Sequence, residues 1–352
     1  MEKLIYGIQQ IGIGVKDAEE AFLWYAKQLG ADVVVFDDSN TATYMAPYMG
    51  GKAHQKRALL AMNMNGGSGY EIWQYEDREP KAPEKPMEIG DFGINIAQIK
   101  ARDIDQAFQK VKAENITCLT DIYTEPDQAR AFLIQDPYGN IIRIKASNNW
   151  YKTRGGNLGG ISGCVLGVSD IEASLKLYAD ILGYDQVVYD VTDQFPAWSG
   201  LSGGGARFRR VLLQHKEERS GGFSPLFGNS ELELIQCLDA PRQAIFKDRY
   251  WGDLGYIHLC FDIHNMPHLV GECDREGYPF QVLSAPSFDM GDTNGHWGYL
   301  EDNDGTLVEF VETHKVPLIK SLKWNIDLRK RDPQRSLPRW LINGLALKRV
   351  KV

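Results

Sequence analysis

The sequence predicts an α+β fold of four βαβββ modules, on the evidence of an internal repeat and of the periodicity inside each copy. The segments that begin at Ile8 and Ile161 share an alternating strand, an aspartate, an amphipathic stretch, a Leu-Gly stop and a β-branched run. Shorter relatives begin at Gly93 and Gly255. Repetition of one pattern along a chain indicates that each copy is one supersecondary unit.

A helix is predicted after the first strand of each module, because apolar residues there recur every three or four positions on one face. In the first module Asp17 stands where an N-cap is expected and Gly30 where a helix ends. Asp170 and Gly183 hold the same places in the third module. Alternating apolar runs after each helix predict the three remaining strands.

Two short motifs predict the turns that join the last strands of modules two and four. Residues 136–140 read Asp-Pro-Tyr-Gly-Asn and residues 302–306 read Asp-Asn-Asp-Gly-Thr. Aspartate first and glycine fourth suit a type I turn. Residues 78–89 and 148–157 read as linkers. We therefore expect module one to pair with two (1–150) and three with four (151–314), followed by a tail (315–352).

Composition excludes several classes of protein. The 352 residues are 43 % hydrophobic and 24 % charged, which is typical of a soluble globular protein and not of a disordered or collagen-like chain. No apolar run is long enough to span a membrane. The N-terminus lacks a signal-peptide pattern, and the five cysteines include no CxxC pair. We expect a cytoplasmic protein with reduced cysteines.

The net charge of −8 is unevenly distributed. Residues 315–352 carry +9 and the rest of the chain −17. An acidic body disfavours nucleic-acid binding, which needs clustered cations. A short apolar helix with basic ends is predicted at 339–349. We expect it to pack on the acidic body or on a partner subunit, with contact to an anionic membrane surface as the alternative.

This repeat resembles the vicinal oxygen chelate superfamily of glyoxalases, bleomycin resistance proteins and extradiol dioxygenases. The resemblance rests on residues 167–184 and on the Asp-x-x-Gly turn before Val-Glu-Phe at 308–310. It implies that paired modules form two incomplete mixed β-barrels. It also implies a divalent metal ion held by residues of the first and last strands of each module.

The resemblance assigns candidate residues at eight positions. Those on first strands are Gln10, Asn95, Gly163 and His258, and those on last strands are Glu71, Arg143, Glu233 and Glu309. The second barrel would then hold one metal ion through His258, Glu309 and Glu233. Because Gly163 offers no ligand, His215 and His296 are candidates to complete the set.

The residue pattern around these positions agrees with the implied metal site. His258 alternates with apolar residues that would lie under a helix, so its side chain is predicted to face the barrel interior. Glu309 lies between Val308 and Phe310, and a buried carboxylate needs a metal, a cation or a proton. Carboxylate and imidazole ligands suit Zn, Ni, Mn, Co or Fe(II). In the first barrel we expect an ion pair between Glu71 and Arg143 in place of a metal.

Three functions are compatible with this site. The preferred one is a metal-dependent lyase or isomerase of glyoxalase or epimerase type, in which Glu233 is the base that removes a proton next to a carbonyl group. The first alternative is a non-haem iron dioxygenase of the extradiol or hydroxyphenylpyruvate type, with Tyr299 as a catalytic residue. The second is a non-catalytic binding protein like those of bleomycin resistance. Each takes a small-molecule substrate or ligand, and a homodimer is compatible with all three.

Overall fold

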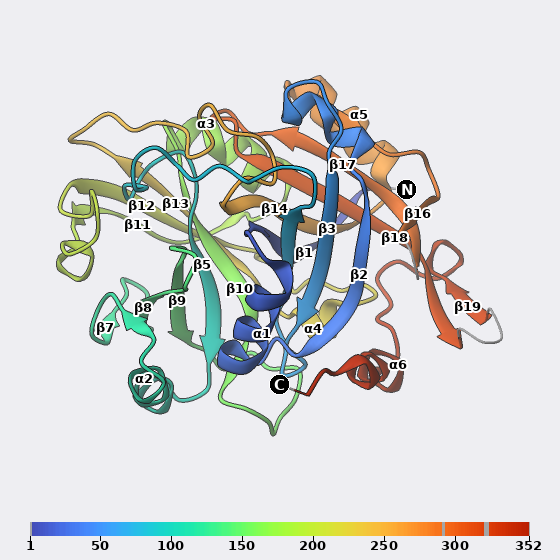
Figure 1. Ribbon diagram of the computed structural model, residues 1–352, viewed down its shortest axis with the longest axis horizontal. Coiled ribbons are helices and arrows are strands. Elements are labelled where there is room, and N and C mark those ends of the chain that lie inside the picture. The colour runs from blue at the N-terminus through green and yellow to red at the C-terminus, as the bar shows by residue number, and fades with distance from the viewer. Residues whose placement is uncertain (1, 291–292, 320–323, 352) are drawn as a thin grey trace.

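The computed structural model of the chain describes residues 2–290, 293–319 and 324–351. It contains four successive strand–helix–strand segments and a C-terminal extension, so the predicted α+β class is confirmed (Figure 1).

The first two modules contain the following elements. Module one has β1 (Leu4–Gly14), α1 (Ala18–Leu29), β2 (Val33–Thr41), η1 (Thr43–Met49), β3 (Gln55–Met62) and β4 (Gly69–Tyr75). Module two has β5 (Gly93–Ala101), α2 (Ile104–Ala113), β6 (Thr117–Cys118), β7 (Tyr123–Thr124), β8 (Arg130–Gln135) and β9 (Ile141–Ala146).

The remaining elements belong to modules three and four and to the tail. Module three has β10 (Leu158–Gly167), α3 (Ile171–Leu175), η2 (Lys176–Ile181), β11 (Gln186–Gln194), η3 (Pro196–Trp198), β12 (Arg207–Gln214), α4 (Ser224–Phe227) and β13 (Glu231–Cys237). Module four has β14 (Gly255–His264), α5 (Met266–Glu276), β15 (Val282–Leu283), β16 (Phe288–Met290), β17 (Thr293–Glu301) and β18 (Leu307–Ile319). The tail has β19 (Trp324–Asp327), η5 (Leu328–Lys330), α6 (Arg339–Asn343) and η6 (Gly344–Lys348).

The predicted helix ends and turns are confirmed. The Asp17 side chain accepts hydrogen bonds from the amides of the first turn of α1, and Gly30 adopts the left-handed conformation at its end. In the turn at 136–140, Asp136 Oδ1 accepts from the amide of Asn140, and Gly139 has a positive φ. Neighbouring residues supply these contacts, and Tyr25 Oη of module one additionally donates to Asp136 Oδ2.

The predicted pairing of modules is wrong. One sheet, sheet A, has the order β15-β17-β18-β14-β1-β4-β3-β2 and joins module one to module four. The other, sheet B, has the order β11-β12-β13-β10-β5-β9-β8-β6 and joins module two to module three. Figure 1 shows the blue strands of module one beside the orange strands of module four.

First strands make the junction in each sheet. β1 runs antiparallel to β14, and β5 runs antiparallel to β10. Every module has a first strand with the same alternating pattern, so the repeat alone does not select a partner. The predicted domain boundary at residue 150 is therefore not a boundary between the two sheets. Each sheet contains strands from before and after this residue.

The tail packs on the body, as preferred from the sequence. Leu337 and Ile342 are buried against Val33 of β2 and Leu226 of α4. The Val350 amide donates to the carbonyl of Asp32, and Arg349 pairs with the Asp32 carboxylate. No helix in the described ranges is long and apolar enough to cross a membrane.

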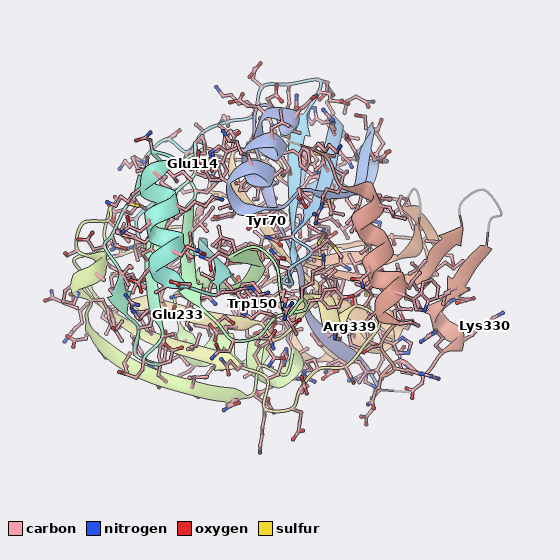
Figure 2. All side chains as sticks on the ribbon, turned by 90° about the horizontal axis from the view of Figure 1, so that it is seen from below. Tyr70, Glu114, Trp150, Glu233, Lys330 and Arg339 are labelled. Atoms are coloured by element: carbon pink, nitrogen blue, oxygen red, sulfur yellow. The ribbon has the colours of Figure 1, made fainter. Side chains whose placement is uncertain are left out.

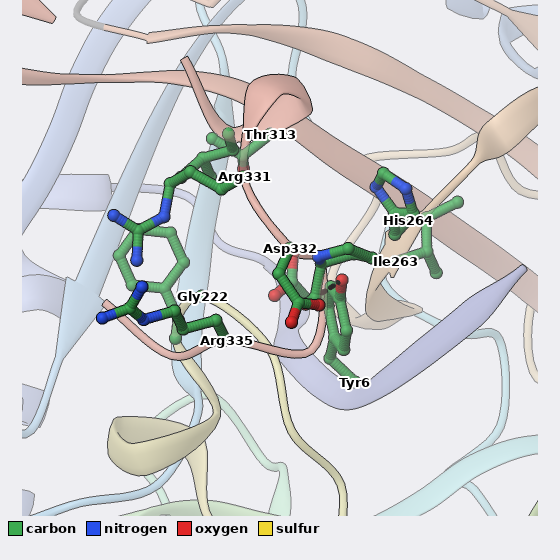
Figure 3. Close-up of a pocket in the computed structure, with 12 residues that line it drawn as sticks. Tyr6, Gly222, Ile263, His264, Thr313, Arg331, Asp332 and Arg335 are labelled. Carbon is green, nitrogen blue, oxygen red and sulfur yellow. Dashed lines mark hydrogen bonds between the residues drawn. The ribbon is translucent and has the colours of Figure 1, made fainter. Parts of the chain in front are cut away.

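A cavity of about 30 Å³ lies where the tail crosses β14, and Figure 3 shows its lining. Tyr6 Oη donates to the carbonyl of Pro333 at its edge. Asp262, which is 3 % exposed, borders the cavity and accepts a hydrogen bond from Gln9. Burial raises the pKa of Asp262 to about 8, and the nearby Glu312 carboxylate acts in the same direction.

This shift predicts a specific dependence of stability on pH. Between the ordinary pKa of 3.8 and about 8, folded Asp262 keeps a proton that the unfolded chain has lost. The free energy of unfolding should therefore fall as pH rises through this window, by up to about 1.4 kcal/mol per pH unit relative to Asp262→Asn. Urea denaturation of both proteins from pH 5 to pH 8 measures the difference, and parallel curves would contradict the prediction.

Candidate metal centre

Three side chains from sheet A converge inside its barrel. They are Glu71 of β4, His258 of β14 and Glu309 of β18, whose potential ligand atoms all lie within 4.8 Å of one another. His258 Nε2 is 3.1 Å from Glu71 Oε2 and 3.1 Å from Glu309 Oε2. The structure thus brings together the predicted pair His258 and Glu309, with Glu71 as the third member.

The register of sheet A explains this convergence. β1 lies between β4 and β14, and Gly12 of β1 is opposite both Glu71 and His258. A Cβ atom at Gly12 would overlap the imidazole of His258, so this position needs glycine for reasons of space. The absent side chain allows the groups on either side of β1 to approach each other.

Gln10 is a fourth polar side chain at the same point. Its Nε2 donates to Glu71 Oε2 at 3.3 Å and to Glu309 Oε2 at 3.4 Å. Its Oε1 is buried and finds no hydrogen-bond partner among the described residues. Because the two ends of an amide are interchangeable by rotation, Oε1 could occupy the position of Nε2 and act as an oxygen ligand.

The buried polar atoms of this cluster suit a cation. His258 Nε2 makes no aligned hydrogen bond within the described chain, although two carboxylate oxygens lie 3.1 Å away. Unpartnered buried polar atoms are rare in folded proteins and need an explanation. Atoms directed at a common point, with one imidazole nitrogen, two carboxylates and one amide oxygen, form a suitable donor set for a divalent metal ion.

The charges within the cluster shift the pKa values of His258 and Glu71. Burial lowers the pKa of His258, but the two adjacent carboxylates outweigh burial and raise it to about 9. Burial also raises the pKa of Glu71, while the imidazole opposes it and holds this pKa below its ordinary value. Without a bound cation, a protonated His258 therefore supplies the positive charge between the carboxylates.

Two aromatic side chains hold His258 in place. The Tyr299 hydroxyl is 3.5 Å from His258 Nδ1, and the Trp251 ring lies parallel to the imidazole with centroids 6.4 Å apart. Burial is the main reason that the pKa of Tyr299 is well above its ordinary value, so this hydroxyl stays protonated. These contacts suit Tyr299 to positioning His258, and the catalytic role predicted for it stays a prediction.

Glu233 is not part of this cluster, so its predicted place beside His258 and Glu309 is wrong. It lies on β13 of sheet B, whereas His258 and Glu309 lie on β14 and β18 of sheet A; Figure 2 labels Glu233. Glu233 Oε2 is 2.6 Å from Arg143 Nη1, and its Oε1 is 2.5 Å from Arg210 Nε. Glu125 bridges the same two arginines at 2.8 and 2.7 Å. A closed ring of two arginines and two glutamates fills the interior of this barrel.

The predicted ion pair between Glu71 and Arg143 is wrong for the same reason. These residues belong to different sheets once module one pairs with four. The Asn95 side chain turns away from the barrel, accepting from the Gly90 amide and donating to the Asp91 carbonyl. Gly163 faces the backbone of Glu231. Sheet B therefore has Arg143 on β9, the last strand of module two, where sheet A has Glu309 on β18, the last strand of module four.

The two histidines considered as substitutes lie elsewhere. His215 Nδ1 contacts the carbonyl of Gly183, and its ring packs on Tyr184 with centroids 3.9 Å apart. His296 of β17 is opposite Glu312, three residues beyond Glu309. Neither completes the cluster, whose remaining places are taken by Gln10 and Glu71.

Comparison with known proteins places the N-terminal part of the chain in a family. The family model described as the Glyoxalase/Bleomycin resistance protein/Dioxygenase superfamily matches residues 7–144. Residues 7–144 therefore belong to this superfamily. The match runs from β1 to β9 and confirms the resemblance inferred from the sequence. Comparison with curated proteins gives no match.

Solved structures extend the superfamily fold to most of the chain. Glyoxalase I from Zea mays is 13 % identical, with a TM-score of 0.54 over 88 % of this chain and 92 % of that one. A mutant of the same maize enzyme gives a TM-score of 0.55, again at 13 % identity, over 88 % and 94 %. A provisionally named dioxygenase from Bacillus subtilis subsp. subtilis str. 168 is 14 % identical, with a TM-score of 0.56 over 88 % and 86 %. At these identities the likeness establishes the fold alone.

Sequence reasoning missed Gln10 and Glu71 as members of the candidate centre. Both were recognised as superfamily positions on a first and a last strand, but were placed in a barrel without a metal. The missing information was the pairing of β1 with β14, which puts these two residues and those of module four in one barrel.

Proposed function

We propose that the chain is a divalent-metal-dependent lyase or isomerase of the glyoxalase or epimerase type. The observation that carries this proposal is the cluster of Gln10, Glu71, His258 and Glu309 on the inner surface of one barrel, with two unpartnered ligand atoms. These four residues would hold the metal ion, and Zn, Ni, Mn, Co and Fe(II) all accept such donors.

A divalent cation in this place would polarise the carbonyl oxygen of a small substrate and stabilise the negative charge of an enolate. Glu71 and Glu309 flank that point and are the groups that could accept the proton from the adjacent carbon. The base is thus one of these two carboxylates rather than Glu233, which is held between two arginines. Buried Trp73 and Trp251 exclude water from the same interior.

The donor set favours this chemistry over the dioxygenase alternative. Non-haem iron dioxygenases use two histidines and one carboxylate. Among the described residues, only His258 contributes an imidazole to the cluster. The third candidate, a binding protein without catalysis, requires neither a metal ion nor the two carboxylates.

The remaining features support a cytoplasmic enzyme of small molecules. The cysteines are free in the structure, consistent with a reducing compartment. The acidic body supports the exclusion of nucleic acid as a partner. A homodimer stays a prediction to be checked by the mass of the protein in solution.

Exchange of hydrogen for deuterium at a carbon next to a carbonyl group tests the proposed chemistry. We expect the metal-loaded protein to catalyse this exchange in small 2-oxoaldehydes or 2-oxoacids in heavy water, followed by NMR. Glu71→Gln and Glu309→Gln keep an oxygen ligand but remove the base, so the variant that retains metal and loses exchange identifies the base.

Two results would contradict the lyase or isomerase proposal. Oxygen consumption with catechols by the Fe(II)-loaded protein would favour a dioxygenase. Ligand affinity and stability that are unchanged in His258→Ala, together with no exchange in the wild-type protein, would favour a binding protein.

A further inference from the structure

Lys56 lies on the same inner surface as the candidate metal centre. On β3, Leu60 is opposite Glu71 and Ala58 is opposite Trp73, while Lys56 is opposite Tyr75. Residues two apart on a strand share a face, so Lys56 points to the side of the sheet that carries Glu71. It is half-buried.

This lysine has no partner in the described part of the chain. Its Nζ makes no hydrogen bond and no ion pair there, whereas the next residue, Arg57, faces outward and pairs with Asp37. A half-buried ammonium group without a partner is unfavourable, because it loses part of its hydration and no protein group replaces the lost hydrogen bonds. Burial lowers the pKa of Lys56, and the charge of Glu71 opposes that effect most, followed by those of Asp38, Glu309 and Glu76. Two of these four carboxylates belong to the centre, so Lys56 lies within its field.

We propose that Lys56 binds a carboxylate group of the substrate whose reacting oxygens lie at the Gln10–Glu71–His258–Glu309 centre. This inference rests on the proposed function and defines its substrate class, a carbonyl compound with a distant anionic group. A single lysine is a point charge that suits a monoanion, and a phosphate would call for further donors.

The register also limits the length of the substrate. Lys56 and the residue opposite Glu71 are four positions apart on β3, a separation of roughly 13 Å along an extended strand. The lysine side chain can lean toward the centre, so the carboxylate would lie within that distance of the reacting oxygens. We therefore expect roughly six to ten chain atoms between the reacting oxygens of the substrate and its carboxylate.

Two chelating probes of equal length test the inference without relying on turnover. Octanohydroxamate and the monohydroxamate of octanedioic acid present the same pair of oxygens to a metal, but only the second has a terminal carboxylate. We expect calorimetry on the metal-loaded wild-type protein to show about tenfold tighter binding of the carboxylate probe, as one charge-assisted hydrogen bond supplies.

The variants are Lys56→Met, Lys56→Arg and, as a matched control, Lys27→Met on the exposed surface of α1. Lys56→Met should lose the preference for the carboxylate probe and bind octanohydroxamate as the wild-type protein does. Lys56→Arg and Lys27→Met should retain the preference. Metal content and the unfolding midpoint of each variant confirm that the centre and the fold are intact.

The outcomes separate this inference from the proposed function. An unchanged preference in Lys56→Met overturns the role of Lys56 alone. A metal content or a midpoint that falls in Lys56→Met, with equal loss of both probes, would make Lys56 a structural counter-ion of Glu71. If the wild-type protein binds neither probe when metal is supplied, the metal centre itself is wrong, and the inference falls with it.

Discussion

Replacement of His258 by alanine should leave the protein unable to retain a divalent metal ion. His258 is the single imidazole of the candidate centre and supplies its one unpartnered nitrogen ligand. Loss of residues that merely orient a ligand costs 10- to 100-fold in metal affinity, so loss of the ligand itself should cost more than about 100-fold. Metal analysis after dialysis and calorimetric titration with Mn²⁺ or Zn²⁺ measure the effect.

The matched controls come from the same chain. His296→Ala removes another buried histidine of sheet A and should keep one metal ion per chain. Glu233→Gln removes the glutamate of sheet B that the sequence suggested as a ligand. This variant should also keep one metal ion per chain. Metal retained by His258→Ala, or lost from a folded Glu233→Gln protein, would show that the centre has been misplaced.

Replacement of Arg143 by methionine should destabilise the protein by about 3–5 kcal/mol without changing its metal content. Arg143 is 1 % exposed and lies between Glu125 and Glu233, so its loss leaves these two buried carboxylates to share the single positive charge of Arg210. Breaking a buried ion pair from one side has a cost of this size. The free energy of unfolding in urea gives the measurement.

Arg57→Met is the control for this prediction. Arg57 pairs with Asp37 on the exposed face of β3, and a surface pair of this kind contributes less than about 1 kcal/mol. A change of similar size in Arg57→Met and Arg143→Met would mean that the ring in sheet B does not depend on its charges.

The same ring should give a defined response to acid. Burial raises the pKa of Glu233, but Arg210 and Arg143 outweigh burial and lower it from 4.5 to about 2. A lowered carboxyl pKa means that the stabilisation is complete above about pH 4.5 and is lost as pH falls toward 2. The stability difference between the wild-type protein and Arg143→Met should therefore narrow over this interval.

Local features of the fold were predictable because short stretches of chain determine them. The Asp17 cap, the Gly30 helix end and the turn at 136–140 form from neighbouring residues, and each is present in the structure. The inward direction of His258 and Glu309 followed from strand alternation, which depends only on the pleat. Both side chains face the candidate centre.

Charge complementarity could not reveal how the modules pair. The expected pairing would have placed Arg143 beside Glu71, and the observed one places Arg143 beside Glu233. Either arrangement puts an arginine next to a glutamate inside a barrel, so both satisfy the buried charges. Residues distant in sequence, such as Glu125 and Arg210, complete the ring only after the strands have paired.

By itself, the sequence determined that the chain contains four related modules and that His258 and Glu309 face inward. The tertiary structure decided which modules share a barrel, and thereby whether Gln10 and Glu71 or Glu233 join His258 and Glu309. The physical reason is one of range. Alternation and capping act over a few residues, whereas the hydrogen bonds between β1 and β14 join strands about 250 residues apart. Because all four first strands share one pattern, the pattern does not select which of them pair.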